Sequence, residues 1–164
     1  ILVIYGSIHL KEIGSRVSNA GLYADYYVPP GNEYITLEGE PSNEVEKAFF
    51  AYEQRQYESA IVAFNNLEIE QMNIGIDFYK AICYAEIDNP NKAINLLSRI
   101  KRFESDYAAK AYWYLALFQM RKENDPQAIM NLQDFIELTQ DQEWRQKAIE
   151  LLKILMDKPE KGNK

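Results

Sequence analysis

The chain has little of what most enzymes use for chemistry: 164 residues contain one cysteine and one histidine. With Cys83 alone, no intrachain disulfide forms, and its apolar surroundings favour a small buried hydrophobe. With His9 as the only histidine, a histidine-based metal site or a Cys–His relay is nearly excluded. The chain also contains no phosphate-binding loop, dinucleotide fingerprint or nucleophile elbow. We therefore expect no catalytic residues, no metal, no cofactor and no enzymatic activity.

Basic residues are also scarce, since 18 lysines and arginines face 25 acidic residues and leave a net charge of −7. A protein that holds phosphate backbones by charge needs a basic stripe. The two basic clusters, Arg99 to Arg102 and Arg121-Lys122, have acids nearby and suit helix ends, which favour cations. We therefore expect no nucleic-acid partner.

The opening run, Ile1 to Tyr5, is apolar but too short to cross a bilayer, which takes about 20 residues. No basic leader precedes it, so it is not a complete signal peptide. Two interpretations stay open: an element that packs on the rest of the chain, or the last turns of a membrane helix that begins before Ile1. Lys11 and Arg16 would suit a membrane-exit position. The missing starting methionine indicates a processed product or a fragment.

What the chain does have is an apolar spacing that occurs three times, at offsets 0, 1, 4 and 7 from an alanine. The sets are Ala60, Ile61, Phe64 and Leu67; Ala93, Ile94, Leu97 and Ile100; and Ala128, Ile129, Leu132 and Phe135. This spacing places each set on one face of a helix. The leading alanines lie 33 residues apart (60 to 93) and 35 apart (93 to 128), and Ala48, Ala81 and Ala116 each stand 12 residues before one. Small residues at both places let two antiparallel helices approach closely, so the period predicts a helical repeat array.

This pattern resembles the tetratricopeptide repeat family, whose repeat is about 34 residues long. The third copy fits best, with Tyr112, Leu115, Ala116 and Ala128. The earlier copies have charged residues where the family prefers large apolar ones: Asp77 and Lys80 in the second, Glu44 and Lys47 in the first. The resemblance covers residues 41 to 156. It implies an all-α, right-handed α-α superhelix of about three helix-turn-helix repeats, with a C-terminal capping helix and an irregular N-terminal segment.

The turn signals and the apolar periodicity predict seven helices. They cover residues 43–54, 57–70, 75–87, 90–101, 105–122, 126–139 and 142–156. Asn89 and Asp125 are the expected caps ahead of Pro90 and Pro126. The last helix carries Trp144, Ala148, Leu151, Leu152 and Leu155 on one face, which should cover the last pair. The expected domains are an N-terminal segment (1–40), the repeats (41–157) and a disordered charged tail (158–164).

Residues 18–41 contain Gly21, Pro29-Pro30-Gly31 and Pro41, which break any long helix. We expect an extended segment with one short helical turn near 22–26, whose aromatic residues pack on the first repeat as a cap. The stretch from Leu22 to Pro29 resembles the outer part of bacterial membrane-anchored tetratricopeptide proteins, where an aromatic, proline-containing segment follows one membrane helix. That likeness implies an anchor before Ile1 and an extracytoplasmic, periplasmic location of the repeats.

In the family, the first helix of each pair lines a concave groove. The resemblance places eight residues there: Phe49, Tyr52, Tyr79, Ile82, Glu86, Tyr114, Leu117 and Arg121. Chaperone-binding members clamp a terminal carboxylate with lysine, asparagine and arginine, but the corresponding places here hold Val45, Phe49, Tyr79 and Tyr114, with only Lys110 basic. An apolar or aromatic partner segment therefore suits this groove better. The alternative that several of these residues only close the core stays open.

The predicted function is a non-catalytic scaffold that binds a protein or peptide segment in the groove. The 12 tyrosines favour such a recognition surface, because tyrosine supplies rigid contact area. Two alternatives stay open. One is a structural self-association module, a homo-oligomer formed through the apolar start and the helix of Trp144. The other is a docking or sensor domain of a larger membrane-anchored regulatory protein or enzyme.

Overall fold

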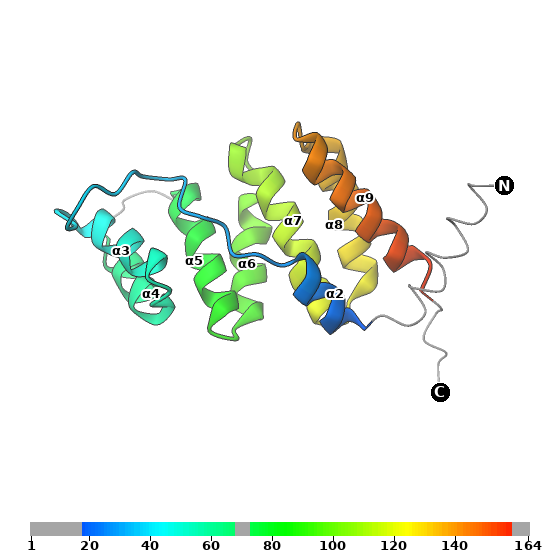
Figure 1. The fold of residues 1–164 in the computed structure, drawn as a ribbon, viewed down its shortest axis with the longest axis horizontal. Coiled ribbons are helices and arrows are strands. Elements are labelled where there is room, and N and C mark those ends of the chain that lie inside the picture. Colours follow the sequence, from blue (N-terminus) through cyan, green and yellow to red (C-terminus); the bar gives the residue numbers. More distant parts are fainter. Residues whose placement is uncertain (1–17, 68–72, 159–164) are drawn as a thin grey trace. The chain divides into compact units, whose positions relative to one another are not determined.

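The computed structural model describes residues 18–67 and 73–158, and every element of regular structure among them is helical (Figure 1). The helices are α2 (Asn19–Tyr26), α3 (Glu44–Glu53), α4 (Tyr57–Asn66), α5 (Ile74–Glu86), α6 (Pro90–Ile100), α7 (Asp106–Arg121), α8 (Asp125–Leu138) and α9 (Gln142–Met156). The predicted all-α fold class is therefore confirmed. The apolar run at Ile1–Tyr5, together with His9, Lys11 and Arg16, lies outside the described residues.

The chain forms two compact units, and each has its own helix packing. The central unit, residues 28–111, contains α3 to α6 and the start of α7. The terminal unit contains α2, the rest of α7, α8 and α9, from residues up to Tyr27 and from Tyr112 onward. The boundaries group residues 28–40 with the first two helix pairs.

The three helix pairs turn in the same way. The turn residues Arg55, Asp88 and Glu123 have φ of 57°, 58° and 59°, and each stands five residues before its alanine. The next residue donates its N–H to a carbonyl five positions back: Gln56 to Ala51 (2.9 Å), Asn89 to Tyr84 (2.8 Å) and Asn124 to Gln119 (2.9 Å). Such a bond closes the end of a helix that terminates in a left-handed residue. The repeat therefore extends from the side chains to the backbone.

The alanine seam is buried, as the repeat pattern requires. Ala48, Ala60, Ala81, Ala93 and Ala128 expose 0% of their surface and Ala116 exposes 1%. In the central unit α3 packs on α4, α4 on α5 and α5 on α6, and in the terminal unit α8 packs on α9. Phe64, Leu97 and Leu132, four residues after the leading alanines, are also buried. The predicted close approach of paired helices is confirmed for α3 with α4 and for α5 with α6.

The predicted helix limits lie close to the observed ones, and α9 has the predicted limits. Asn89 caps α6 as expected, because its Oδ1 accepts the N–H of Lys92 at 3.4 Å. α4 ends at Asn66, whereas the prediction ran to Glu70, and residues 68–70 lie outside the described part. The short helix near 22–26 starts earlier, at Asn19, because Ser18 Oγ accepts the N–H of Gly21 at 3.1 Å.

The prediction that Asp125 caps the following helix is wrong. Asp125 is the first residue of α8, and its carboxylate instead accepts the Asn19 side-chain amide at 2.7 Å and lies 3.5 Å from the Lys158 ammonium. Asn19 also donates to the carbonyl of Met120 at 2.8 Å and accepts a hydrogen bond from Lys158. This network joins three parts of the terminal unit. It also corrects the prediction for Lys158, which belongs to the folded unit rather than to a disordered tail.

α9 covers the last pair in the predicted way. Ala148, Leu151 and Leu155 are buried, and the Trp144 ring meets the Trp113 ring edge-on, with centroids 5.1 Å apart. None of the described helices is long and apolar enough to cross a membrane.

Candidate peptide-binding site

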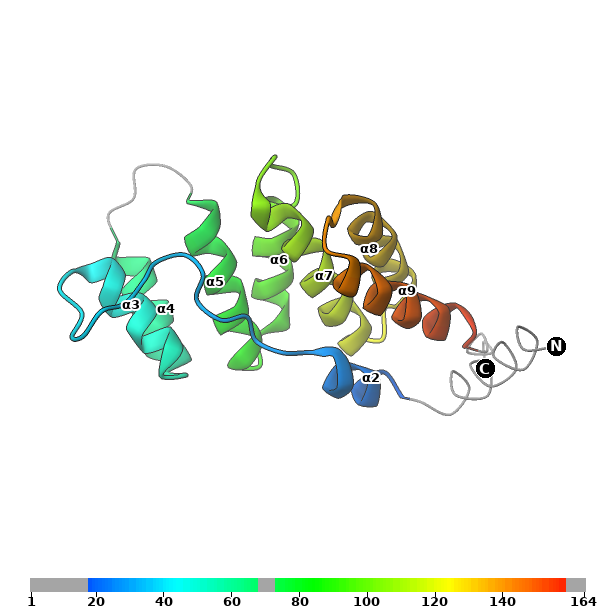
Figure 2. The ribbon, with the colours of Figure 1, turned by 45° about the horizontal axis from the view of Figure 1, so that its top comes forward.

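Residues 28–35 run in extended form beside the helices of the central unit (Figure 2). Two tyrosines from first helices of pairs, Tyr52 on α3 and Tyr79 on α5, hold the backbone of this stretch. The Tyr52 hydroxyl donates to the carbonyl of Pro30 at 2.5 Å, and the Tyr79 hydroxyl donates to the carbonyl of Gly31 at 3.0 Å. Tyr79 also accepts the N–H of Glu33 at 2.8 Å. These bonds address main-chain groups, which every peptide carries.

The Tyr79 hydroxyl is therefore both donor and acceptor in a confined place. Burial raises its pKa to about 12, and the hydrogen bond from the Glu33 N–H counteracts part of that shift. A hydroxyl that donates must keep its proton, so the raised pKa maintains the bond to Gly31 over the whole physiological range.

Tyr34 makes the most specific side-chain contacts between this stretch and the helices of the central unit. Its ring stacks on the Phe49 ring, with centroids 5.0 Å apart and an interplanar angle of 10°. Its hydroxyl accepts the Asn73 side-chain amide at 2.6 Å. Gly75 leaves room for the ring, because a Cβ at that position would lie 2.4 Å from Tyr34 Cε2 and 3.2 Å from the Tyr107 ring. The ring therefore sits in a place that only a glycine at position 75 permits.

Glu33 and Asn32 complete the polar contacts of the stretch. The Lys110 ammonium lies 2.5 Å from the Glu33 carboxylate and 5.6 Å from the centre of the Tyr107 ring. The Asn32 amide donates to Glu53 at 2.9 Å, and its oxygen accepts the N–H groups of Tyr34 and Ile35, at 3.0 and 3.2 Å. This local turn directs the Glu33 side chain to a cation and the Tyr34 side chain to an aromatic surface.

In the terminal unit, residues 22–27 are held mainly by contacts between aromatic rings. Tyr27 stacks on Tyr23, with centroids 4.7 Å apart, and meets the Tyr114 ring edge-on at 6.0 Å. The Arg121 guanidinium lies over the Tyr23 ring, 5.2 Å from its centre. Leu22 exposes only 2% of its surface. α2 is thus anchored by apolar area on α7.

These contacts correct the prediction that the aromatic residues of the N-terminal segment all pack on the first repeat. Tyr34 does contact Phe49 of the first pair. Tyr23, Tyr26 and Tyr27 instead contact Phe118, Trp113 and Tyr114 of α7. The physical reason is that residues up to Tyr27 belong to the same compact unit as most of α7, where these three rings offer them favourable aromatic pairs.

The predicted groove residues are mostly covered. Phe49, Tyr52, Tyr79, Ile82, Tyr114 and Leu117 expose 0 to 4% of their surface. Glu86 is half-buried and Arg121 is exposed. In the central unit the structure brings Phe49, Tyr52 and Tyr79 together under residues 30–34, whereas Ile82 faces the core. Their role in binding a partner stays a prediction, and as the chain is folded here these aromatic residues contact the chain's own segment.

Sequence reasoning did not single out four residues that form these contacts, Tyr34, Asn73, Gly75 and Tyr107, and it named Lys110 only as the one basic residue of the groove. One signal was available, since Gly75 stands in the first turn of a helix, where glycine costs about 1 kcal/mol relative to alanine and needs a reason. No comparable signal singles out Tyr34 among 12 tyrosines.

Other chemistry is sparse in the part of the chain that the structure describes. Cys83 is fully buried, as predicted, and burial raises the pKa of its thiol to about 12, so it is a poor nucleophile. Residues 18–67 and 73–158 contain no group of three or more His, Cys, Asp or Glu side chains placed to hold a metal ion.

The candidate site is therefore defined by its geometry: two backbone-reading tyrosines, a cation for an acidic side chain and a glycine-lined place for an aromatic ring. Comparison of the chain with protein-family models, with curated proteins and with solved structures found no match.

Proposed function

We propose that this chain is a non-catalytic scaffold of the tetratricopeptide type, which binds an extended segment of a protein partner on the first helices of the central unit. The observation that carries the proposal is that these helices already hold an extended peptide, residues 30–34, through main-chain hydrogen bonds. A surface that reads main-chain groups accepts other sequences that follow the same course.

The side-chain contacts define the partner's chemistry. Lys110 suits an acidic residue, and the place formed by Phe49, Asn73 and Gly75 suits a following tyrosine. The partner is therefore an extended segment with an acidic residue directly before a tyrosine. This is narrower than the apolar or aromatic segment expected from the repeat pattern alone.

The chain's own stretch competes with such a partner. A tethered segment has an effective concentration of about a millimolar or more, so a partner succeeds only if it binds more tightly or if the tethered segment is lifted. Residues 28–35 thus set the minimum affinity that a partner segment needs in order to bind.

The proposal is tested with a labelled peptide of sequence YVPPGNEYI, which copies residues 27–35, and two full chains, the wild type and Tyr34→Ala. In the variant the tethered copy lacks its ring, so the site is open to the peptide. We expect Tyr34→Ala to bind the peptide at least about tenfold more tightly than the wild type, as expected when a tethered competitor weakens by about 1.4 kcal/mol. Fluorescence anisotropy measures the affinity.

Two controls make the test specific. A peptide whose tyrosine at the position of Tyr34 is alanine should not bind, and Lys110→Glu in the Tyr34→Ala chain should weaken binding of the intact peptide. Circular dichroism verifies that each variant keeps its helices. A helical Tyr34→Ala chain that does not bind the intact peptide contradicts the proposal and leaves residues 28–35 as a structural cap only.

A further inference from the structure

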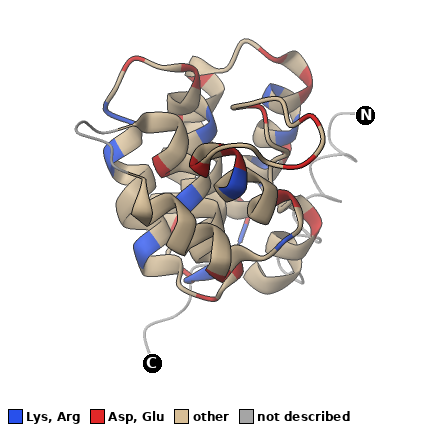
Figure 3. Cartoon of the chain, turned by 90° about the vertical axis from the view of Figure 1, so that its left-hand side faces the viewer, with Lys and Arg blue, Asp and Glu red and all other residues tan. Residues whose placement is uncertain are grey.

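The α5–α6 hairpin of the central unit has a shallow cavity whose lining includes none of the residues described above as contacting residues 28–35. Its volume is about 240 Å³, and it is lined by Lys80, Tyr84, Lys92, Asn95, Leu96 and Arg99. Half of these residues are cationic and none is acidic, in a chain of net charge −7. Figure 3 shows that Lys/Arg and Asp/Glu are otherwise interspersed along the ribbon. The lining is therefore cationic in a chain whose net charge is negative.

Lys80 is a half-buried cation of this lining. Its side chain exposes 18% of its surface, and the Asp77 carboxylate lies 3.7 Å from its ammonium, beyond hydrogen-bond range. Among the described residues, none accepts a hydrogen bond from this ammonium. An ammonium has three donors, and Asp77 contacts this one only at ion-pair distance, so donors remain for a further acceptor. An anion in the cavity could accept hydrogen bonds from them.

The other copies of the repeat make Lys80 unusual. One residue before the seam alanine, the third copy has Leu115, which is 1% exposed, and the first has Lys47. Lys47 exposes 53% of its side chain and is paired with Glu44 at 2.6 Å. Lys80 has a carboxylate partner at the same spacing, Asp77, but the two groups are 3.7 Å apart and the Lys80 side chain is only 18% exposed. The repeat itself does not require a lysine here.

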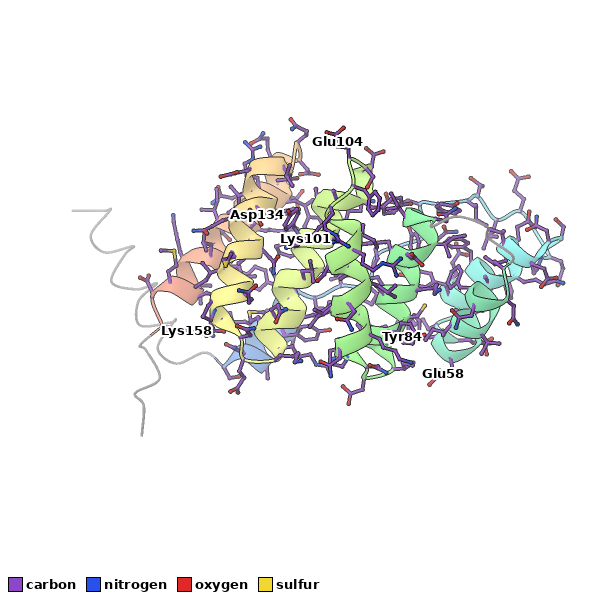
Figure 4. All side chains as sticks on the ribbon, turned by 180° about the vertical axis from the view of Figure 1, so that it is seen from behind. Glu58, Tyr84, Lys101, Glu104, Asp134 and Lys158 are labelled. Carbon is purple, nitrogen blue, oxygen red and sulfur yellow. The ribbon has the colours of Figure 1, made fainter. Side chains whose placement is uncertain are left out.

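The remaining donors come from α6. Lys92, Asn95 and Arg99 stand at intervals of three and four residues, which places them along one side of that helix. The Lys92 ammonium lies 4.9 Å from the centre of the Tyr84 ring, and no described carboxylate forms an ion pair with it. Figure 4 labels Tyr84, near the end of α5, and Lys101, just beyond the opposite end of the hairpin. The lining residues of α6 run from its first turn, at Lys92, to its last turn, at Arg99.

We propose that this cavity binds a small oxyanion with two negative charges, of the phosphate class. Three cations and an amide supply charge-assisted hydrogen bonds to such a group. The volume is below the roughly 300–1,000 Å³ of pockets that enclose whole drug-sized ligands, so the cavity receives the charged group and not a larger molecule. The group comes either from free phosphate or from a phosphorylated side chain of a partner. This site shares no residue with the peptide site and does not depend on it.

The test is a titration of the ¹⁵N-labelled full chain with sodium phosphate at constant ionic strength, followed by NMR. We expect saturable shifts of the amides of Lys92, Asn95 and Arg99 and of the Asn95 side-chain NH₂. Sodium chloride at the same ionic strength should give none of these shifts. A phosphoserine peptide, compared with its unphosphorylated form, identifies the source: tighter binding than phosphate assigns a protein partner, and equal binding assigns the free ion.

Matched variants separate binding from a structural role. Lys80→Met should weaken phosphate binding by about tenfold or more, as expected for the loss of one charge-assisted hydrogen bond. It should not lower the melting temperature, because the third copy has leucine there. Lys47→Met, at the same repeat position in the first copy, should leave the affinity within twofold. Absent or non-saturable shifts with phosphate, or equal weakening by Lys47→Met, overturn the proposal.

Discussion

The two units hold adjacent parts of one N-terminal stretch by different physical means. The central unit holds residues 30–34 by directional bonds to Pro30, Gly31 and Glu33 and by one ring in a glycine-lined place. The terminal unit holds residues 22–27 by stacked and tilted rings and by apolar burial. Hydrogen bonds weaken steeply with distance and angle, whereas ring packing tolerates small shifts. The contacts of the central unit therefore fix which residue of the stretch lies at each position. The contacts of the terminal unit only hold α2 against α7.

This difference bears on function. A shift of one residue in the 28–35 stretch would break both bonds of Tyr79 to Gly31 and Glu33 and remove Tyr34 from its place, so under the proposed function we expect the central unit to distinguish one sequence from another. The same shift in α2 would leave most of its apolar surface covered. Selective recognition of a partner segment is thus expected in the central unit, and simple anchoring in the terminal one.

The largest effect on this difference between the units is expected when the space for the Tyr34 ring is filled. In Gly75→Ala, the new methyl group would lie 2.4 Å from the ring, so the ring must leave. Because burial of a large apolar side chain contributes about 1.5–3 kcal/mol, we expect a loss of about 2 kcal/mol in the free energy that holds residues 30–34. The Glu33 amide should exchange with solvent about 30-fold faster, while the Leu22 amide of α2 is unchanged. Hydrogen exchange followed by NMR measures both.

A double-mutant cycle is the control for that prediction. In a Tyr34→Ala background the new methyl group meets only the Tyr107 ring, at 3.2 Å, and alanine is the better helix former by about 0.8–1 kcal/mol, so Gly75→Ala should be close to neutral or stabilising. If Gly75→Ala destabilises both backgrounds equally, the glycine serves helix α5 rather than the register of the stretch.

A smaller effect is expected from the protonation of Tyr79, whose pKa is raised to about 12 against an ordinary value of 10.0. Between pH 10 and 12 the unfolded chain loses this proton while the folded chain keeps it, so the folded chain binds more protons and stability falls as pH rises. The slope from one group is at most about 1.4 kcal/mol per pH unit. Urea unfolding at several alkaline pH values should show a shallower decline in Tyr79→Phe than in the wild type.

Tyr26→Phe is the matched control from the terminal unit. Burial also raises the pKa of Tyr26, but its hydroxyl has no hydrogen-bond partner among the described residues. At neutral pH, Tyr79→Phe should cost about 1–3 kcal/mol, because the Gly31 carbonyl and the Glu33 N–H lose their partner, and Tyr26→Phe should cost little. Equal costs at neutral pH would falsify the distinction between directional and area-based contacts.

The repeat itself was predictable from the sequence because its signal is local and periodic. Ala60, Ala93 and Ala128 mark the positions where helices approach closely, and periodic apolar residues predict helices wherever an interior must be filled. Helix limits followed from caps such as Asn89. The exception is Asp125. Aspartate is a common cap residue, but the Asp125 carboxylate accepts a hydrogen bond from Asn19, 106 positions away in the chain. Local pattern reasoning cannot detect a partner at such a separation.

The site was less predictable for a related reason. The resemblance identified Phe49, Tyr52 and Tyr79 as facing a groove, and it says nothing about what covers them. The cover comes from residues 28–35, whose proline and glycine content indicates only an extended chain. Which helices such a chain contacts depends on long-range pairings, here Tyr34 with Phe49 and Glu33 with Lys110. These pairings leave no periodic trace in the sequence.

The smallest predicted effect concerns a feature that both units share, the left-handed turn residue between paired helices. Arg55 has φ of 57°, a conformation that costs a residue with a Cβ about 1–2 kcal/mol and costs glycine nothing. Glycine also makes the unfolded chain more flexible, which removes about half of that gain, so Arg55→Gly should raise the free energy of unfolding by about 0.5 kcal/mol. Gln54→Gly, one residue earlier at φ −77°, should lower it by about the same amount. Urea midpoints that move in opposite directions for these neighbours would locate the strain in the turn, and midpoints that fall together would show that side-chain contacts of Arg55 outweigh it.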